Sequence, residues 1–316
     1  MSRPVIGFIA RRSSSAVILL LVVSALTFFL MDLLPDPGQG ILGVSATDEQ
    51  LAAKRAELGL DRPVVLRWLD WLGAAVRGDL GTSWTTGLRV SDSIGTKLPV
   101  TLSLTLTATL VCAVLGIALG LIAAIRRGAV DRSVHVLAVA GFAVPGLWVG
   151  ILLVTVFAVR LEVLPATGYV PLAESPVDWA RSLVLPVATI AVAGVAAIAQ
   201  QTRNAVAEVL ERDYIRTLRS RGLPARRVLF VHVLRNATPP ALTVVGLQFI
   251  GLLGGALVIE QIFALPGLGS LAIGATSQSD VPTVQGVVLV SVCVVVTVNL
   301  AVDLATGALD PKVGMR

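Results

Sequence analysis

Six long apolar runs divide the chain, and each is free or nearly free of charged side chains. They cover residues 13–33, 98–125, 133–159, 182–202, 237–260 and 281–304. Each exceeds the ~18 residues that a helix needs to cross a ~30 Å hydrocarbon core. Only helices and closed barrels satisfy every backbone group in lipid, and these runs do not alternate with period two. The pattern therefore predicts an all-α polytopic membrane protein with six transmembrane helices.

The polar segments between the runs differ in their content of basic residues. Most Arg and Lys outside 34–97 fall in 1–12, in the short loop after 98–125, in 203–236 and in 305–316. The short segments on the opposite side carry only Arg160 and Arg181. The positive-inside rule therefore predicts that both termini and 203–236 are cytoplasmic. It also predicts that 34–97 and 261–280 are extracytoplasmic.

Composition agrees with the pattern of apolar runs. The chain is 55% hydrophobic and 14% charged, with a mean hydropathy of +0.85, whereas about a quarter of the residues of soluble proteins are charged. The high pI of about 9.9 then follows from the topology, and we expect no nucleic-acid partner. Cys112 and Cys293 both fall inside apolar runs, where buried thiols that pack as small apolar groups are expected.

The extracytoplasmic segment 34–97 carries signals for two short helices. Thr47 and Gln50 have the spacing of a capping box, and Gly59 suits the end of that helix. A second helix is predicted to start near Pro63. Its apolar face includes Trp68, and it either lies along the outer membrane surface or packs against the ends of the bundle.

Glycine and proline inside the apolar runs predict close packing and one kink. Three pairs have the small-xxx-small spacing that lets helices approach closely, namely Gly116/Gly120, Gly146/Gly150 and Gly251/Gly255. Pro145 lies in the middle of 133–159, where the loss of one backbone hydrogen bond favours a bend.

The inventory of chemical motifs predicts a protein that is not an enzyme. The sequence has no GxSxG or HExxH motif and no GxxxxGK[ST] phosphate-binding loop. We therefore expect no catalytic residue, cofactor or metal site in this chain. Glu260 and Asp303 fall at the ends of apolar runs, where we expect both to reach water. Gln248, Asn299 and Glu260 are candidates to line a pathway, on the basis of their polarity at depth.

The polar segment 203–236 is the most informative part of the chain, and it holds eight of the 25 Lys and Arg residues. Its apolar positions predict one short helix up to a stop at Gly222, and a second helix from Pro224. Glu208 and Arg212 form a favourable i,i+4 pair. Two helices joined at a glycine predict a protruding element that binds a soluble partner, whereas the simpler alternative is an ordinary basic loop.

The same segment carries a resemblance to a known family. YIRTLRSRGLPARRVLFVHVLRNATPPALTVVGLQ resembles the cytoplasmic coupling signature of ATP-binding-cassette (ABC) importer permeases of the dipeptide/oligopeptide/nickel family, first-subunit branch. Further stretches that resemble this branch are ELGLDRPVVLRWLDWLGAAVRGDLGTSW, LPVTLSLTLTATL, VLPATGY, EQIFALPGLGSL and ALDP. The resemblance extends over essentially the whole chain. It implies the type I importer permease fold, with the ABC transmembrane type-1 domain over about 97–307.

The resemblance implies that the chain forms half of a channel in a bacterial plasma (inner) membrane. Its expected partners are a second, similar permease, two cytoplasmic ABC ATPase subunits or domains, and an extracytoplasmic substrate-binding protein. ATP and Mg²⁺ would bind to the ATPases. The expected cargo is di- or oligopeptides.

The residues expected to couple the chain to the ATPases lie around the glycine. They are Asp213, Tyr214, Arg216, Thr217, Leu218, Arg219, Gly222 and Arg226. General importer permeases show Glu-Ala-Ala, three further residues and then Gly. Here Arg216, Thr217 and Leu218 stand in place of Glu-Ala-Ala, and only Gly222 is kept. The peptide branch typically departs in the same way, often with Ala where this chain has Leu218.

Three alternatives stay open. The same architecture could import nickel chelates, glutathione or another small solute. A self-contained secondary transporter would require inverted repeats and charged residues at the bilayer midplane, and neither is visible. A membrane enzyme would require a catalytic constellation, which the sequence lacks.

Overall fold

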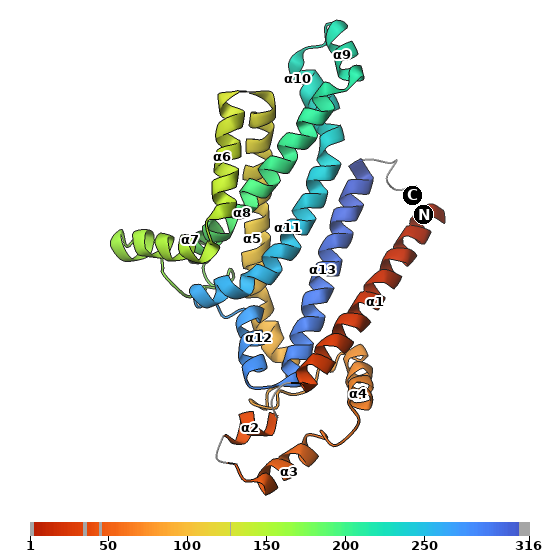
Figure 1. The fold of residues 1–316 in the computed structure, drawn as a ribbon, viewed down its shortest axis with the longest axis vertical. Helices are drawn as coiled ribbons and strands as arrows, with labels where there is room; N and C mark the ends of the chain where they lie inside the picture. Colours follow the sequence, from red (N-terminus) through yellow and green to blue (C-terminus); the bar gives the residue numbers. More distant parts are fainter. Residues whose placement is uncertain (1–2, 34–36, 44–45, 127, 310–316) are drawn as a thin grey trace. The chain divides into compact units, whose positions relative to one another are not determined.

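The computed structural model describes residues 3–33, 37–43, 46–126 and 128–309. The end of the predicted C-terminal segment, with Lys312, Arg316 and part of the ALDP stretch, lies outside these residues. Within them the chain is helical (Figure 1), and the extended pairing is limited to an isolated bridge between Thr82 and Arg89. The all-α prediction is thus confirmed.

The helices are α1 (Arg3–Asp32), α2 (Pro37–Leu42), α3 (Asp48–Glu57), α4 (Val64–Val76), α5 (Val90–Ile125), α6 (Ala129–Ala143), α7 (Gly146–Leu153), η1 (Val154–Arg160), α8 (Pro176–Glu211), α9 (Asp213–Ser220), α10 (Ala225–Arg227), η2 (Val228–Val233), α11 (Leu234–Ile262), α12 (Leu268–Ser277) and α13 (Val281–Leu309).

Five helices in the described residues are long and apolar enough to cross a membrane without a break. A sixth span is present if α6 and the α7–η1 pair count as one bent helix, so the predicted six spans agree with the structure. The bend falls at Val144–Pro145, as the sequence predicts, because Pro145 has no N–H and pushes Val144 into an extended conformation with φ −88° and ψ 120°. Helices such as α8 also run beyond the predicted span limits. Those limits remain predictions, because a helix end does not mark a membrane surface.

The chain divides into two compact units. Unit 1 contains residues 1–9, 102–265 and 297–316. Unit 2 contains residues 10–101 and 266–296.

In unit 1, α8 packs against α6, α7 and α11. It also approaches α5 closely, since a Cβ added to Gly116 would lie 2.7 Å from Cβ of Ile198. Gly120 is tighter still, because the backbone oxygen of Ala199 fills the position that its Cβ would take.

The three small-xxx-small glycine pairs therefore differ in their environment. Gly116 and Gly120 lie directly on α8, whereas a Cβ on Gly251 or Gly255 would meet no atom of the described residues within 4 Å. In the pair Gly146/Gly150, only Gly150 has such neighbours. Of the three predicted contacts between helices, the Gly116/Gly120 pair is the one that the described part of the chain forms in full.

In unit 2 the two predicted outer helices are present. Thr47 caps α3, its side chain accepts a hydrogen bond from Gln50 N, and the full capping box forms. The second helix, α4, starts after Pro63 and packs on an apolar cluster that includes Phe28, Met31 and Val284. Trp68 Nε1 donates to Ser24 Oγ over 3.0 Å. The structure thus favours the second alternative for this helix, packing against the end of the bundle.

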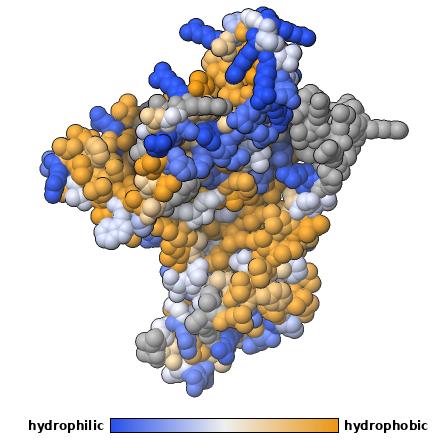
Figure 2. All heavy atoms as spheres, turned by 45° about the horizontal axis from the view of Figure 1, so that its top comes forward, coloured by the Kyte–Doolittle hydropathy of each residue, from blue (hydrophilic) through white to orange (hydrophobic). Residues whose placement is uncertain are grey.

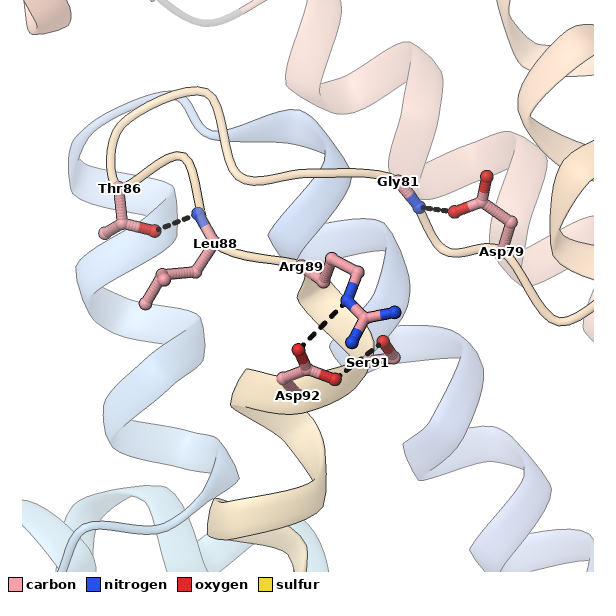
Figure 3. Close-up of polar contacts among 7 residues, drawn as sticks. All are labelled: Asp79, Gly81, Thr86, Leu88, Arg89, Ser91 and Asp92. Carbon is pink, nitrogen blue, oxygen red and sulfur yellow. Dashed lines mark hydrogen bonds and ion pairs between the residues drawn. The ribbon is translucent and has the colours of Figure 1, made fainter.

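A buried carboxylate joins two distant parts of unit 2. Asp280 is 2% exposed and accepts hydrogen bonds from Ser83 Oγ at 2.6 Å, Thr283 Oγ1 at 2.8 Å and Trp84 N at 3.1 Å. The loop that supplies Ser83 and Trp84 is itself ordered by short-range contacts (Figure 3). Asp79 accepts from Gly81 N at 2.9 Å, and Arg89 Nε donates to Asp92 at 3.1 Å. Because a buried charge is costly without partners, this loop holds the start of α13 in place.

The close approach of α5 to α8 gives a first prediction. The change Gly120→Ala forces a methyl group against the backbone of Ala199, which cannot move as a side chain can. We expect destabilisation of about 1–3 kcal/mol, seen as a lower midpoint of thermal unfolding in detergent. The matched control is Gly274→Ala in α12, where a Cβ meets no atom within 4 Å. Equal midpoints for the two variants would show that the α5–α8 contact is looser than described.

Candidate functional site

The predicted helix–glycine–helix element is present at one end of unit 1. Helix α8 ends at Glu211, Arg212 adopts an extended conformation with φ −66° and ψ 143°, and α9 then runs from Asp213 to Ser220. After a short turn, Ala225 starts a continuous helical stretch through α10 and η2 into α11. Figure 1 shows α9 and α10 beyond the ends of α8 and α11. The element therefore connects directly to two long helices that pack on each other.

Gly222 ends α9 in the way that the sequence predicts. Its φ is +76°, in the left-handed region that favours glycine. Gly222 N donates to Arg219 O at 3.0 Å, and Leu223 N donates to Leu218 O at 3.3 Å. These two bonds form a Schellman motif, and the side chains of Leu218 and Leu223 both pack on the same apolar cluster. The turn is thus fixed by both backbone and side chains.

An apolar cluster holds α9 against the rest of unit 1. Ile215 is completely buried, together with Val206 and Val209 of α8 and Val228 and Val233 of η2. Leu218 and Leu223 pack against the same cluster from its edge. An isolated helix of eight residues is not stable in water, so burial of Ile215 and Leu218 sets the position of α9.

The other predicted coupling residues face outward. The side chains of Asp213 and Arg216 are 97% and 75% exposed, and their 3.7 Å ion pair contributes little to stability. Tyr214 is 38% exposed and accepts a 3.3 Å hydrogen bond from Asn236 Nδ2. Figure 2 shows hydrophilic side chains protruding at this end of unit 1. The predicted ion pair between Glu208 and Arg212 is confirmed at 2.9 Å.

A groove of about 500 Å³ lies beside α9. Arg219 and Arg226 line it, and apolar residues of α5, α8 and η2, including Leu210 and Val228, form its other walls. The structure therefore brings all eight predicted coupling residues to one protruding element. Six of them (Asp213, Tyr214, Arg216, Thr217, Arg219 and Arg226) are exposed, Leu218 is half-buried, and Gly222 shapes the turn. The groove and the Asn236–Tyr214 contact were not predicted, because they depend on tertiary neighbours.

The candidate pathway residues do not all lie together, because Glu260 is well separated from Gln248. Gln248 is half-buried, and its Nε2 would lie 3.0 Å from a Cβ on Gly194 of α8. Glu260 is on the same helix, twelve residues further on, or roughly 18 Å along its axis. Asn299 is half-buried on α13. Their assignment to a pathway stays a prediction.

One expectation about these residues is wrong. Glu260 was expected to reach water, yet it is only 1% exposed. The chain folds back directly after α11, where Leu265 N donates to Glu260 O at 2.8 Å. Phe263 and Leu265 are each buried to 1% exposure in this turn. The position of Glu260 at the end of an apolar run therefore did not reveal that the fold buries its side chain.

Comparison with solved structures identifies the class of fold. The chain resembles a chain of the MetNI methionine ABC transporter in an inward-facing conformation, with a TM-score of 0.53 over 68% of this chain and 95% of that one. The sequence identity is 16%, so the likeness concerns the fold alone. The chain has the fold of an ABC importer permease.

Family comparison is more specific. Residues 116–315 match the binding-protein-dependent transport system inner membrane component, and residues 5–105 match the N-terminal component of such systems. The chain belongs to this family, as a multi-pass protein of the inner membrane.

Several relatives match over nearly their full length. A Brucella abortus protein named as a peptide transport system permease is 43% identical, over 96% of this chain and 98% of that protein. The di/tripeptide transport system permease of Pseudomonas aeruginosa is 38% identical, over 98% and 99%. The glutathione transport system permease of Escherichia coli is 35% identical, over 98% and 99%. Within the family the chain therefore belongs with the dipeptide/oligopeptide permeases.

The burial of Ile215 gives a second prediction. The change Ile215→Ala removes about 2–4 kcal/mol of packing from the cluster that holds α9. We expect faster amide hydrogen exchange across 213–223, with little change in the middle of α8. The control is Arg216→Ala in the same helix, since that side chain is 75% exposed. Unchanged exchange in Ile215→Ala would mean that the cluster does not position α9.

Proposed function

We propose that this chain is the permease subunit of an ABC importer and forms half of the pathway for di- and oligopeptides. A second, similar permease completes the pathway. Two cytoplasmic ATPase subunits or domains supply the energy, and an extracytoplasmic binding protein delivers the peptide. Membership of the binding-protein-dependent family supports this assembly. Peptide as the cargo is supported by the names of the relatives in Brucella and Pseudomonas.

The observation that carries the proposal is the position of α9. Its outer face presents Asp213, Tyr214 and Arg216, while its inner face is anchored by Ile215. A movement imposed on the outer face is therefore passed to α8 and η2 through a packed cluster rather than through a flexible loop. The groove lined by Arg219 and Arg226 offers an ATPase a second contact.

ATP hydrolysis belongs to the partner subunits in this proposal, because the sequence contains no phosphate-binding loop. The chain itself then supplies no catalytic residue, and ATP and Mg²⁺ bind to the ATPases. The distribution of Arg and Lys supports cytoplasmic positions for both termini and for α9.

Glutathione is a second candidate cargo. The Escherichia coli relative named for glutathione transport is 35% identical and matches over almost the whole chain. Glutathione is itself a tripeptide, so the same pathway could accept both. Competition between labelled dipeptide and unlabelled glutathione, in liposomes containing the complete importer, separates these cargoes. Efficient displacement by glutathione but not by other tripeptides would favour the second candidate.

Assembly is the direct test of the proposal. The tagged chain should copurify with one other permease and with ATPase subunits, and liposomes containing the complex should take up peptide only with ATP and the binding protein. Uptake by the lone chain without ATP would instead support a secondary transporter.

Gly222 gives a third prediction. Valine resists a φ of +76°, and the left-handed conformation costs a non-glycine residue about 1–2 kcal/mol. We expect Gly222→Val to reduce ATP-dependent peptide uptake roughly tenfold in the reconstituted complex. Gly222→Asn is the matched control, because asparagine tolerates this region and should retain most of the uptake. If Gly222→Val keeps both uptake and stimulated ATPase activity, coupling does not require this turn.

A further inference from the structure

A polar pocket and an apolar groove adjoin each other in unit 1, away from α9. The polar pocket has a volume of about 490 Å³ and lies between the start of α6 and the later part of α8. Asp131, Arg132 and His135 line it from α6, and Gln200, Arg203 and Asn204 line it from α8. The apolar groove has a volume of about 440 Å³ and lies between α5, α6 and α8. Val134 and Ala138 line both, so the two spaces are neighbours, and we treat them as the two ends of one site.

The polar end of this site has an excess of positive charge. Arg203 binds Asp131 through two hydrogen bonds, Nε to Oδ1 at 2.9 Å and Nη2 to Oδ2 at 2.7 Å. That pair is neutral overall, and it holds the guanidinium in a fixed position at the pocket wall. Arg132 is exposed and has no ion-pair partner among the described residues. The pocket thus presents one fixed and one uncompensated guanidinium, which together suit a phosphate group.

The groove below the polar pocket is suited to a hydrocarbon chain. Its walls are aliphatic, and Leu115, Leu119 and Val192 are 49%, 38% and 41% exposed there. Along α8 the groove extends from Ala199 to Ala188, which is about 16 Å at 1.5 Å per residue. Half of a ~30 Å hydrocarbon core is about 15 Å. An acyl chain of a single leaflet therefore fits the length of the groove.

The depth of the site in the membrane agrees with this fit. Arg203 is the first charged residue after the uncharged part of α8 that begins at Ser182. It therefore lies where an apolar run gives way to the polar boundary, at the level of lipid headgroups. Basic pockets between transmembrane helices on the cytoplasmic side are known to bind anionic headgroups. The lining of the groove is almost entirely apolar, which disfavours water there, and a free phosphate would leave the groove empty.

We propose that this site binds one anionic glycerophospholipid, with its phosphate between Arg132 and Arg203 and one acyl chain in the groove between α5, α6 and α8. The site is separate from α9, and the proposal does not require that the chain transport peptide. It predicts a lipid that stays with the purified protein when the surrounding bilayer lipid has been removed.

The test is a lipid titration of the purified protein, read by native mass spectrometry. Phosphatidylglycerol or phosphatidylethanolamine with equal acyl chains is added to delipidated protein in detergent. We expect one tightly retained phosphatidylglycerol, and retention of phosphatidylethanolamine that is weaker by about fivefold or more, since one uncompensated basic group contributes that much. Addition of inorganic phosphate should not displace the lipid, because phosphate does not occupy the groove.

Two pairs of variants separate this site from general lipid contact. Arg132→Gln should lower phosphatidylglycerol retention about fivefold, whereas Arg235→Gln, an equal loss of charge at an exposed residue outside the site, should not. Val192→Trp fills the groove and should also lower retention. Its control is Val184→Trp, because Val184 is 44% exposed on the same helix outside the groove.

The outcomes are distinguishable even if a bulky variant folds poorly. Arg132 is an exposed side chain, so Arg132→Gln should leave the thermal midpoint unchanged and can decide the question alone. Equal retention of both lipids, or equal loss in Arg132→Gln and Arg235→Gln, would overturn the proposal. A second copy or a partner permease seated in the groove in a map of the complex would overturn it as well.

Discussion

Close packing around α8 is the constraint on which the rest of unit 1 depends. Lipid tails are as apolar as the side chains of the spans, so the hydrophobic effect does not press these helices together. Their association relies on close contact instead, and glycines of three helices provide it. Gly120 of α5, Gly141 of α6 and Gly150 of α7 all lie against α8, and for Gly141 the nearest atom to an added Cβ would be the backbone oxygen of Val192, at 3.0 Å. Helix α8 is thus held by close contacts with three neighbouring helices.

The position of α9 follows from this arrangement. Helix α8 reaches Glu211, and a single extended residue, Arg212, separates it from α9. Burial of Ile215 and the Schellman turn at Gly222 then fix the short helix on the ends of α8 and η2. The outward residues carry almost no share of this stability, since their ion pairs are exposed. The inner face thus determines where α9 lies, and the outer face stays exposed.

Much of this arrangement could be predicted from the sequence, because it rests on local signals. The length of the apolar runs gave the spans, Pro145 gave the bend, and the spacing around Gly222 gave the helix–glycine–helix element. The sequence signals that did not predict the structure correctly were those whose outcome depends on residues far away in the sequence. Gly251/Gly255 has the same spacing as Gly116/Gly120, yet among the described residues only the latter pair meets another helix. Glu260 resembled a residue at a membrane surface, yet the fold leaves it only 1% exposed. The groove beside α9 likewise arises from residues of α5, α8, α9, α10 and η2, and no single stretch of sequence specifies it.

The contacts of Asp280 bear on the order in which the protein is made. Asp280 is 197 residues away from Ser83 in the sequence, and Gln285 donates to the backbone of Ser24 across 261 residues. At a ribosomal rate of 5–20 residues per second, roughly ten to forty seconds pass between the synthesis of Ser83 and that of Asp280. During this interval the loop around Ser83 and Trp84 lacks the carboxylate that later holds it. Unit 2 therefore cannot be completed until Asp280 and the start of α13 have been synthesised, and a chain that stalls before α13 lacks the contacts that hold the loop around Ser83.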